Sequence, residues 1–463
     1  MNSAQPSAIR PSLPSYLQQE PNAKSTAQPE LPNDLEEDFT HSSCNSYIRY
    51  GPNIIHQIPH PHDQVSTSVV LRFCRTRVLR SYGQLLAAVG WKPLIDEPGT
   101  GWKGFWGRLF NALYVLVVVS LIVGGHVLTI LLYYRRDALI HQRCRRFRLS
   151  SDPLEEPDRC SPYLFSVFVL PASLHIIAFL VMMRRMRSHD SEEFTALVER
   201  VFLQTTSIWQ IARRKIQERL RAVYWLGVLW ILLALVANAY NILYSLKKEQ
   251  INCSSNDVLM LVFLVIGLLA HDLSSMCIAV AYTIHCQLAL VYVQNLQTLV
   301  RGGKISLLAF YKGTCEATGT IRQVNGMQGT AVFLQTFWLL IRTMASIVGF
   351  VQSIDSEDYA RLGLASVSIV VWGSLLTVPL GQAARLSEAC NGIRDLGREL
   401  RSRPLVYQET SLQELDSLVV YTASFDLTAD LCSIRVTKER LTLCCVLLAI
   451  TIYGSAHFDM LHF

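Results

Sequence analysis

The sequence predicts an all-α, polytopic membrane protein with seven transmembrane helices, and three observations support this prediction. Hydrophobic residues make up 51% of the 463-residue chain and charged residues only 17%, against about 25% charged residues in ordinary soluble domains. Apolar runs long enough to cross a bilayer as helices, about 20 residues each, recur along the chain. The twelve cysteines show no metal-ligand spacing, and several lie inside apolar runs, so no disulfide framework is expected.

The first segment, residues 1–66, is rich in Pro, Ser, Gln and Asn and has no sustained apolar period. This composition predicts a disordered cytoplasmic tail. No apolar core follows the start of the chain, so no signal peptide is expected. His56, His60 and His62 could be considered as metal ligands, but prolines separate them in a flexible tail, and a linker is the better interpretation.

The second segment, residues 67–109, leads into the membrane. From Val69 to Leu94, apolar and basic residues recur at helical spacing, which predicts a basic amphipathic helix on an anionic cytoplasmic leaflet. The aromatic and glycine-rich run GTGWKGFWGRLF follows. Residues 110–382 then hold six predicted spans, and residues 441–463 hold the seventh. The predicted spans cover residues 110–134, 162–183, 223–245, 258–287, 330–352, 362–382 and 441–460.

A polar segment, residues 383–440, separates the last two spans. Arg385 to Arg401 has the spacing of an amphipathic helix, and Pro404 breaks it. Ser411 and Glu414 form a capping box that opens a second helix. We expect both helices to lie on the membrane surface and to lead into the final span. The apolar positions of the second helix are Leu412, Leu415, Leu418, Val419 and Ala423.

The orientation follows from the loops. A cytoplasmic N-terminus and an extracellular C-terminus place most of the Lys and Arg residues inside, as the positive-inside rule requires, although the arginine-rich first outside loop departs from it. The sequon Asn252-Cys253-Ser254 then lies outside, where Asn252 can be glycosylated. The net charge of +6 reflects these cytoplasmic basic residues, so a nucleic-acid partner is not expected.

Polar side chains within the predicted spans are candidates for ligand contact. Ionisable and amide groups in a span usually face the protein interior or water. With the orientation above, five of them fall in the outer half of the membrane, where a pocket could hydrogen-bond a small ligand. For each residue, hydrogen bonding between packed helices is the alternative. These residues are His126, Tyr133, Asn238, Asn241 and Tyr244.

Two further sets of polar residues stand out in the spans. Asp272 in the fourth span and Arg342 in the fifth each need a partner, and we hypothesise that they form an intramembrane ion pair. The polar positions of the last span suit weakly selective cation passage, although packing against the sixth helix explains them equally well. These positions are Thr451, Tyr453, Ser455 and His457.

Catalytic and transport functions are less well supported. The chain has no G-x-S-x-G or H-E-x-x-H motif, and Gly302-Gly303-Lys304 lacks the spacer of a phosphate-binding loop. A membrane enzyme would need His126, His175 or His271 to converge with carboxylates, and only Asp272 is available within a span. Secondary transporters often consist of two related halves, and seven helices do not divide into halves. We expect no enzyme activity, cofactor or metal.

The stretch before the last span resembles a signature of a known family. Tyr421-Thr-Ala-Ser-Phe-Asp-Leu-Thr-Ala-Asp-Leu-Cys-Ser-Ile-Arg435-Val-Thr-Lys-Glu-Arg440-Leu is similar to the lead-in to the last helix of arthropod gustatory receptors, part of the insect chemoreceptor superfamily. That family continues with Thr-Tyr and closes on Gln-Phe. Here Ile452 separates Thr451 from Tyr453, and the chain closes on His462-Phe463.

This resemblance implies a gustatory receptor, a ligand-gated, non-selective cation channel subunit in the plasma membrane. It implies a tetramer, alone or with related subunits, that binds a small-molecule tastant in the bundle of residues 110–382 and contacts membrane lipid. It also implies that residues 383–440 form a cytoplasmic anchor and residues 441–463 line the pore. A transporter or a non-conducting seven-helix receptor for a small ligand remains the alternative.

Overall fold

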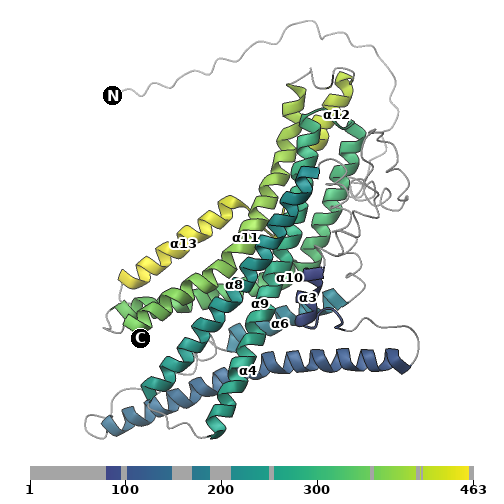
Figure 1. The fold of residues 1–463 in the computed structure, drawn as a ribbon. Coiled ribbons are helices and arrows are strands. Elements are labelled where there is room, and N and C mark those ends of the chain that lie inside the picture. Colours follow the sequence, from purple (N-terminus) through teal and green to yellow (C-terminus); the bar gives the residue numbers. More distant parts are fainter. Residues whose placement is uncertain are drawn as a thin grey trace, which may run out of the picture. The chain divides into compact units, whose positions relative to one another are not determined.

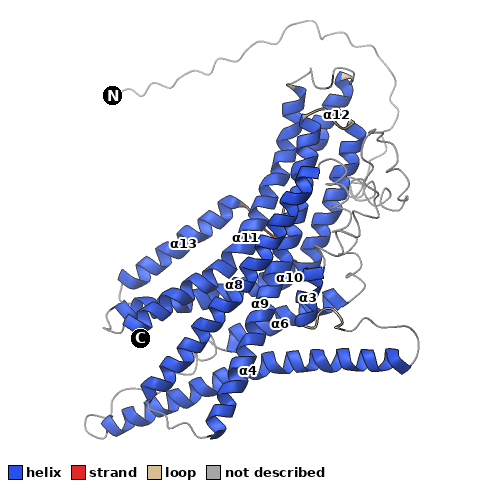
Figure 2. Cartoon of the chain, viewed as in Figure 1, coloured by secondary structure: helices blue, strands red, loops and turns tan. Residues whose placement is uncertain are grey.

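The computed structural model describes residues 80–94, 102–148, 169–187, 210–249, 255–354, 359–402, 407 and 410–457. Nearly all of these residues are helical (Figure 2), so the all-α prediction is confirmed for this part of the chain. The predicted tail, residues 1–66, and the sequon at Asn252 lie outside the described residues.

The helices follow one another along the chain as labelled in Figure 1. A two-stranded antiparallel hairpin precedes the last of them. The elements are α3 (Arg80–Ala88), α4 (Trp102–Arg148), α6 (Leu170–Arg187), α8 (Gln210–Glu249), α9 (Ser255–Arg301), α10 (Leu307–Ile354), α11 (Tyr359–Arg401), α12 (Leu412–Ala423), β1 (Asp430–Leu431), β2 (Ile434–Arg435) and α13 (Lys438–His457).

Five helices among the described residues are long and apolar enough to cross a membrane. They are α4, α8, α9, α10 and α11, and they correspond to the first, third, fourth, fifth and sixth predicted spans. The second and seventh predicted spans correspond to α6 and α13, which are helical but are not among the five. The total of seven spans and the orientation of the termini therefore stay predictions.

Helices α9, α10 and α11 are much longer than the spans predicted within them, at 47, 48 and 43 residues. At 1.5 Å per residue each is about 65–70 Å long, about twice the thickness of a hydrocarbon core. Arg385 to Arg401, predicted as a separate surface helix, continues α11 without a break. Hydropathy detects only the apolar part of such a helix, whereas the polar part stays helical because it packs on neighbouring helices.

The end of α9 shows what Gly302-Gly303-Lys304 does in the structure. Gly303 has a φ of 63°, a left-handed conformation that glycine adopts without steric cost. Its N–H donates to the Val300 carbonyl at 3.0 Å, and the N–H of Lys304 donates to the Leu299 carbonyl at 3.0 Å. This pair of bonds is a Schellman motif. The glycines therefore end the helix.

The predicted second helix of the polar segment is α12, and the predicted N-cap at Ser411 is confirmed. Ser411 is the N-cap, and its hydroxyl accepts a hydrogen bond from the Glu414 N–H at 3.3 Å. The buried face differs from the predicted stripe, since it consists of Leu415, Leu418 and Thr422, whereas Leu412 is 75% exposed. The reason is the packing of α12 on α11, which covers only one narrow side of the short helix.

Hydrogen bonds join the polar ends of the long helices to one another. Gln297 of α9 donates from Nε2 to the Ala389 carbonyl of α11 at 2.6 Å. The Tyr407 hydroxyl lies 3.1 Å from the carbonyl oxygens of both Val300 and Ile305, and burial raises its pKa above the ordinary value. The polar end of α9 and the polar segment, residues 383–440, are therefore packed together.

Helix α3 lies within the range predicted as a surface helix, Val69 to Leu94, but it is packed against α9. Tyr82, Leu85 and Leu86 are buried, and Trp91 just beyond the helix is 1% exposed. The apolar face that was predicted to meet lipid therefore meets protein.

Candidate functional site

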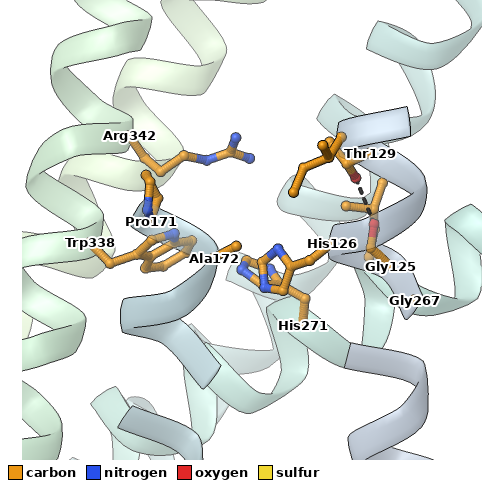
Figure 3. Close-up of a pocket in the computed structure, with 11 residues that line it drawn as sticks. Gly125, His126, Thr129, Pro171, Ala172, Gly267, His271, Trp338 and Arg342 are labelled. Atoms are coloured by element: carbon orange, nitrogen blue, oxygen red, sulfur yellow. Dashed lines mark hydrogen bonds between the residues drawn. The ribbon is translucent and has the colours of Figure 1, made fainter. Parts of the chain in front are cut away.

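A small cavity lies where α4, α6, α9 and α10 meet (Figure 3). Its volume of about 40 Å³ exceeds the 10–15 Å³ that one water needs. Polar side chains from separate helices border it, which is unusual between apolar helices. The lining residues are Gly125, His126, Thr129, Ile130, Pro171, Ala172, Gly267, Leu268, His271, Trp338 and Arg342.

Two glycines bring α4 and α9 together beside this cavity. A Cβ placed on Gly267 would lie 2.6 Å from the Cα of Gly125, closer than real Cβ atoms approach. Such small-residue contacts let helix backbones approach each other in membranes. His126 follows Gly125 directly, and His271 lies one turn after Gly267 on the same face of α9. The glycine contact therefore places the two histidines near each other.

Three histidines from three helices form a cluster at this place, which we call the histidine cluster: His126 of α4, His175 of α6 and His271 of α9. Nε2 of His126 lies 3.3 Å from Nδ1 of His175. The ring centroids of His175 and His271 are 4.1 Å apart, and those of His126 and His271 are 4.9 Å apart. His175 and His271 are buried, and His126 is half-buried. Each ring offers one nitrogen, and these three nitrogens lie within 4.8 Å of one another.

A carboxylate adjoins the cluster. Oδ1 of Asp272 lies 2.9 Å from Nδ1 of His271, and Asn238 of α8 donates from Nδ2 to Oδ2 of Asp272 at 2.7 Å. Asp272 is 1% exposed, and a buried carboxylate needs such partners. Asn238, predicted as a ligand contact, therefore forms a hydrogen bond from α8 to Asp272 of α9.

Arg342 of α10, the predicted partner of Asp272, lines the cavity that His271 also lines. Its guanidinium lies 5.1 Å from the ring centroid of Trp372 on α11, in a cation–π contact. Although the structure describes both side chains, it shows no direct ion pair between Asp272 and Arg342. The ion pair stays a prediction, and the groups that hold Asp272 in this structure are His271 and Asn238.

Asn241 and Tyr244, two further predicted ligand contacts, are not among the residues that line this cavity. The Asn241 side chain is exposed, and Tyr244 is half-buried. The side chain of Tyr133 lies outside the described residues. Of the five predicted residues, His126 lines the cavity and Asn238 reaches the neighbouring Asp272.

The predicted pore positions lie near the end of α13, Lys438–His457. The helix backbone is described as far as His457, whereas the side chains from residue 451 onward are not. The backbone therefore places the four positions on one helix. Whether they line a pore stays a prediction. The positions are Thr451, Tyr453, Ser455 and His457.

From the sequence, His175 and His271 were candidates only for a membrane enzyme that brings histidines together with carboxylates. Trp338 and the serines beside His175 carried no sequence signal. The structure brings the three histidines together next to Asp272. A usable signal was present, because polar residues at similar depth in neighbouring spans tend to meet inside a bundle. Helix pairing decides which of them meet, and the sequence does not show it.

Comparison with solved structures identifies the fold. The chain is similar to the insect olfactory receptor OR5 from Machilis hrabei in complex with eugenol, with a TM-score of 0.55 and 11% sequence identity over 84% of this chain and 99% of the receptor. A second structure of OR5 from Machilis hrabei matches with a TM-score of 0.49 and 11% identity, over 83% of this chain and 98% of the receptor. No protein-family model and no curated protein sequence matches the chain. The chain therefore shares the fold of an insect olfactory receptor.

Proposed function

We propose that this chain is a subunit of a chemoreceptor channel, a ligand-gated, non-selective cation channel that detects a small molecule. The observation that supports it is the shared fold, which extends over almost the whole length of an insect olfactory receptor. That receptor was solved in complex with eugenol, which makes a small organic molecule a reasonable class of ligand.

Within this class we propose a gustatory receptor of the plasma membrane. The lead-in from Tyr421 to Leu441 supports this choice, since it resembles the corresponding stretch of gustatory receptors. The channel would be a tetramer in which α13 lines the pore and the polar ends of α9, α10 and α11, with α12, hold the subunits together. The length of α9, α10 and α11 supports an anchor outside the bilayer. Each helix is about twice as long as the hydrocarbon core is thick, so about half of it extends beyond the membrane.

The test is whole-cell current in cells that express the chain alone. Sugars, bitter compounds, bicarbonate with carbon dioxide, and eugenol are applied in turn, and Tyr453→Ala is recorded beside the unmodified chain. We expect a ligand-evoked, weakly selective cation current whose selectivity or size changes in Tyr453→Ala. Surface protein without current, in the presence and absence of related subunits, would contradict the channel. Ligand uptake without current would favour a transporter.

A further inference from the structure

We propose that the histidine cluster is a binding site for a divalent transition-metal ion of the zinc type, held by one imidazole nitrogen each from His126, His175 and His271. Imidazole is a preferred ligand of zinc, copper and nickel, and three histidines with one open position is a common zinc ligand set. The site is independent of the proposed channel function, since metal binding is measured on the purified chain. It would join α4 and α6 to α9.

The spacing of the nitrogens suits such an ion. Zinc–nitrogen bonds of about 2.0–2.1 Å in tetrahedral geometry place ligand nitrogens roughly 3.3 Å apart. His126 Nε2 and His175 Nδ1 are already 3.3 Å apart, and one nitrogen from each of the three rings lies within 4.8 Å of the other two. Small movements of the rings would therefore complete the ligand set.

The hydrogen bonds of His175 leave the correct nitrogen available. Ser274 and Ser275 both donate their hydroxyl protons to the His271 carbonyl, at 2.8 and 3.0 Å. Their oxygens, at 3.0 and 3.1 Å from His175 Nε2, can then only accept. His175 therefore carries its proton on Nε2, and its Nδ1, which faces His126, keeps a lone pair.

His271 is oriented in the same manner. The Asp272 carboxylate accepts from Nδ1 of His271 at 2.9 Å, so Nε2 keeps the lone pair. A carboxylate that orients a histidine in this way is the usual outer partner of a metal ligand. Asn238 holds Asp272 in turn, at 2.7 Å. Two of the three rings are thus fixed by other side chains in the form that binds a metal.

His126 is the ring that must change when the metal binds. Because His175 Nδ1 is an acceptor, His126 donates from Nε2 in the present arrangement. Moving this proton to Nδ1 frees Nε2 for the metal without changing the charge of the ring. His126 is also the least buried ring of the cluster, so the ion can enter from the cavity, in which Figure 3 shows His126 and His271 close together.

Among the residues that line the cavity, Arg342 is the only one with a permanent positive charge. Its charge opposes a cation, and the nearby Asp272 carboxylate offsets part of this effect. The positive charge also favours an anion, such as chloride or hydroxide, in the open position of the metal. Arg342→Gln should therefore change the affinity for the metal and its dependence on chloride, without changing the number of bound ions.

The experiment uses the purified full-length chain in detergent, with any affinity tag removed. His56, His60 and His62 are replaced by Asn in every protein, so that the tail cannot bind the probe. Cobalt(II) is titrated in while the visible absorption spectrum is recorded, and zinc is then added in competition. We expect one cobalt ion per chain with the spectrum of a tetrahedral site, and its displacement by zinc. His126→Asn should weaken binding at least tenfold, whereas Thr129→Val, on the same cavity wall, should not.

A second measurement needs no variant of the cluster. Zinc K-edge X-ray absorption of the zinc-loaded chain should show three imidazole ligands and one further ligand, either an oxygen or a chloride. Asp272→Asn should lower the zinc affinity by about 10- to 100-fold while it keeps the same three ligands. A chain that binds no cobalt or zinc, or zinc surrounded mainly by oxygen, would overturn the proposal. Equal binding by His126→Asn and the parent chain would overturn it as well.

Discussion

Gly125 of α4 and Gly267 of α9 contact each other backbone to backbone. A Cβ on Gly125 would lie 2.9 Å from the carbonyl carbon of Gly267, and a Cβ on Gly267 would lie 2.6 Å from the Cα of Gly125. No side chain fits between the two helices at this point. Because His126 and His271 are fixed on these helices, the glycine contact determines the distance between two members of the histidine cluster.

The first prediction concerns this contact. Gly267→Ala should destabilise the protein by about 1–3 kcal/mol, because the added methyl group forces the two helices apart. Thermal unfolding of the purified chain measures this effect. The control is Gly373→Ala in α11, where a Cβ meets nothing within 4 Å and alanine should be neutral or stabilising by up to about 1 kcal/mol. Equal effects of the two substitutions would show that the helix contact does not matter.

The second prediction tests the ion pair of Asp272 and Arg342. Asp272→Arg or Arg342→Asp alone should reduce surface expression, because each leaves like charges near each other within the membrane. The double exchange should restore expression if the two groups attract each other. Surface biotinylation measures the result. Failure of the double exchange would end the ion-pair hypothesis and leave His271 and Asn238 as the partners of Asp272.

The third prediction concerns pH and the polar bundle. Burial raises the pKa of Tyr407, so folding favours the protonated hydroxyl that contacts Val300 and Ile305. Its contribution is therefore complete below the ordinary tyrosine pKa of about 10 and is lost as the pH rises through the higher pKa of the folded state.

Tyr407→Phe tests this sign. The substitution should cost about 1 kcal/mol near neutral pH, and the difference from the parent chain should shrink as the pH rises above about 10. Chemical denaturation at several pH values measures both effects. A difference that stays constant through the alkaline range would contradict the role of the hydroxyl proton.

The fourth prediction concerns the capping box of α12. Ser411→Ala should cost about 1 kcal/mol, because the Glu414 N–H then loses its side-chain acceptor. Ser411→Asp keeps an acceptor at the N-cap and should cost much less. Thermal unfolding of the parent chain and of the two variants measures the loss of stability that each substitution causes. If both destabilise equally, the cap does not contribute.

The fifth prediction concerns orientation. If the N-terminus is cytoplasmic, Asn252 lies outside the cell and can be glycosylated. Endoglycosidase treatment of the expressed chain should then increase its mobility on a gel. Asn252→Gln should remove this change without removing the protein from the surface. A chain that carries no glycan, but is labelled at this loop by antibody only after permeabilisation, would require the opposite orientation.

The sequence alone determined several features of this protein. The low share of charged residues and the repeated apolar runs predicted a helical membrane protein. In lipid every backbone N–H and C=O must be hydrogen-bonded within the protein, and a helix satisfies this requirement within a single segment. The capping-box pattern of Ser411 and Glu414 predicted where α12 begins, since the hydrogen bond from the Glu414 N–H to the Ser411 hydroxyl is local. Asp272 and Arg342 were recognisable as exceptional, because a charge within a span is costly wherever its helix packs.

Which helices meet depends on the packing of the whole bundle. The sequence could not show that Arg385 to Arg401 continues α11, because neighbouring helices stabilise that polar part. It could not group His126, His175 and His271 either, since their separation along the chain exceeds any local period. Their meeting depends on the contact of Gly125 with Gly267 and on the packing of α6 between the other helices, and packing is a property of the whole bundle.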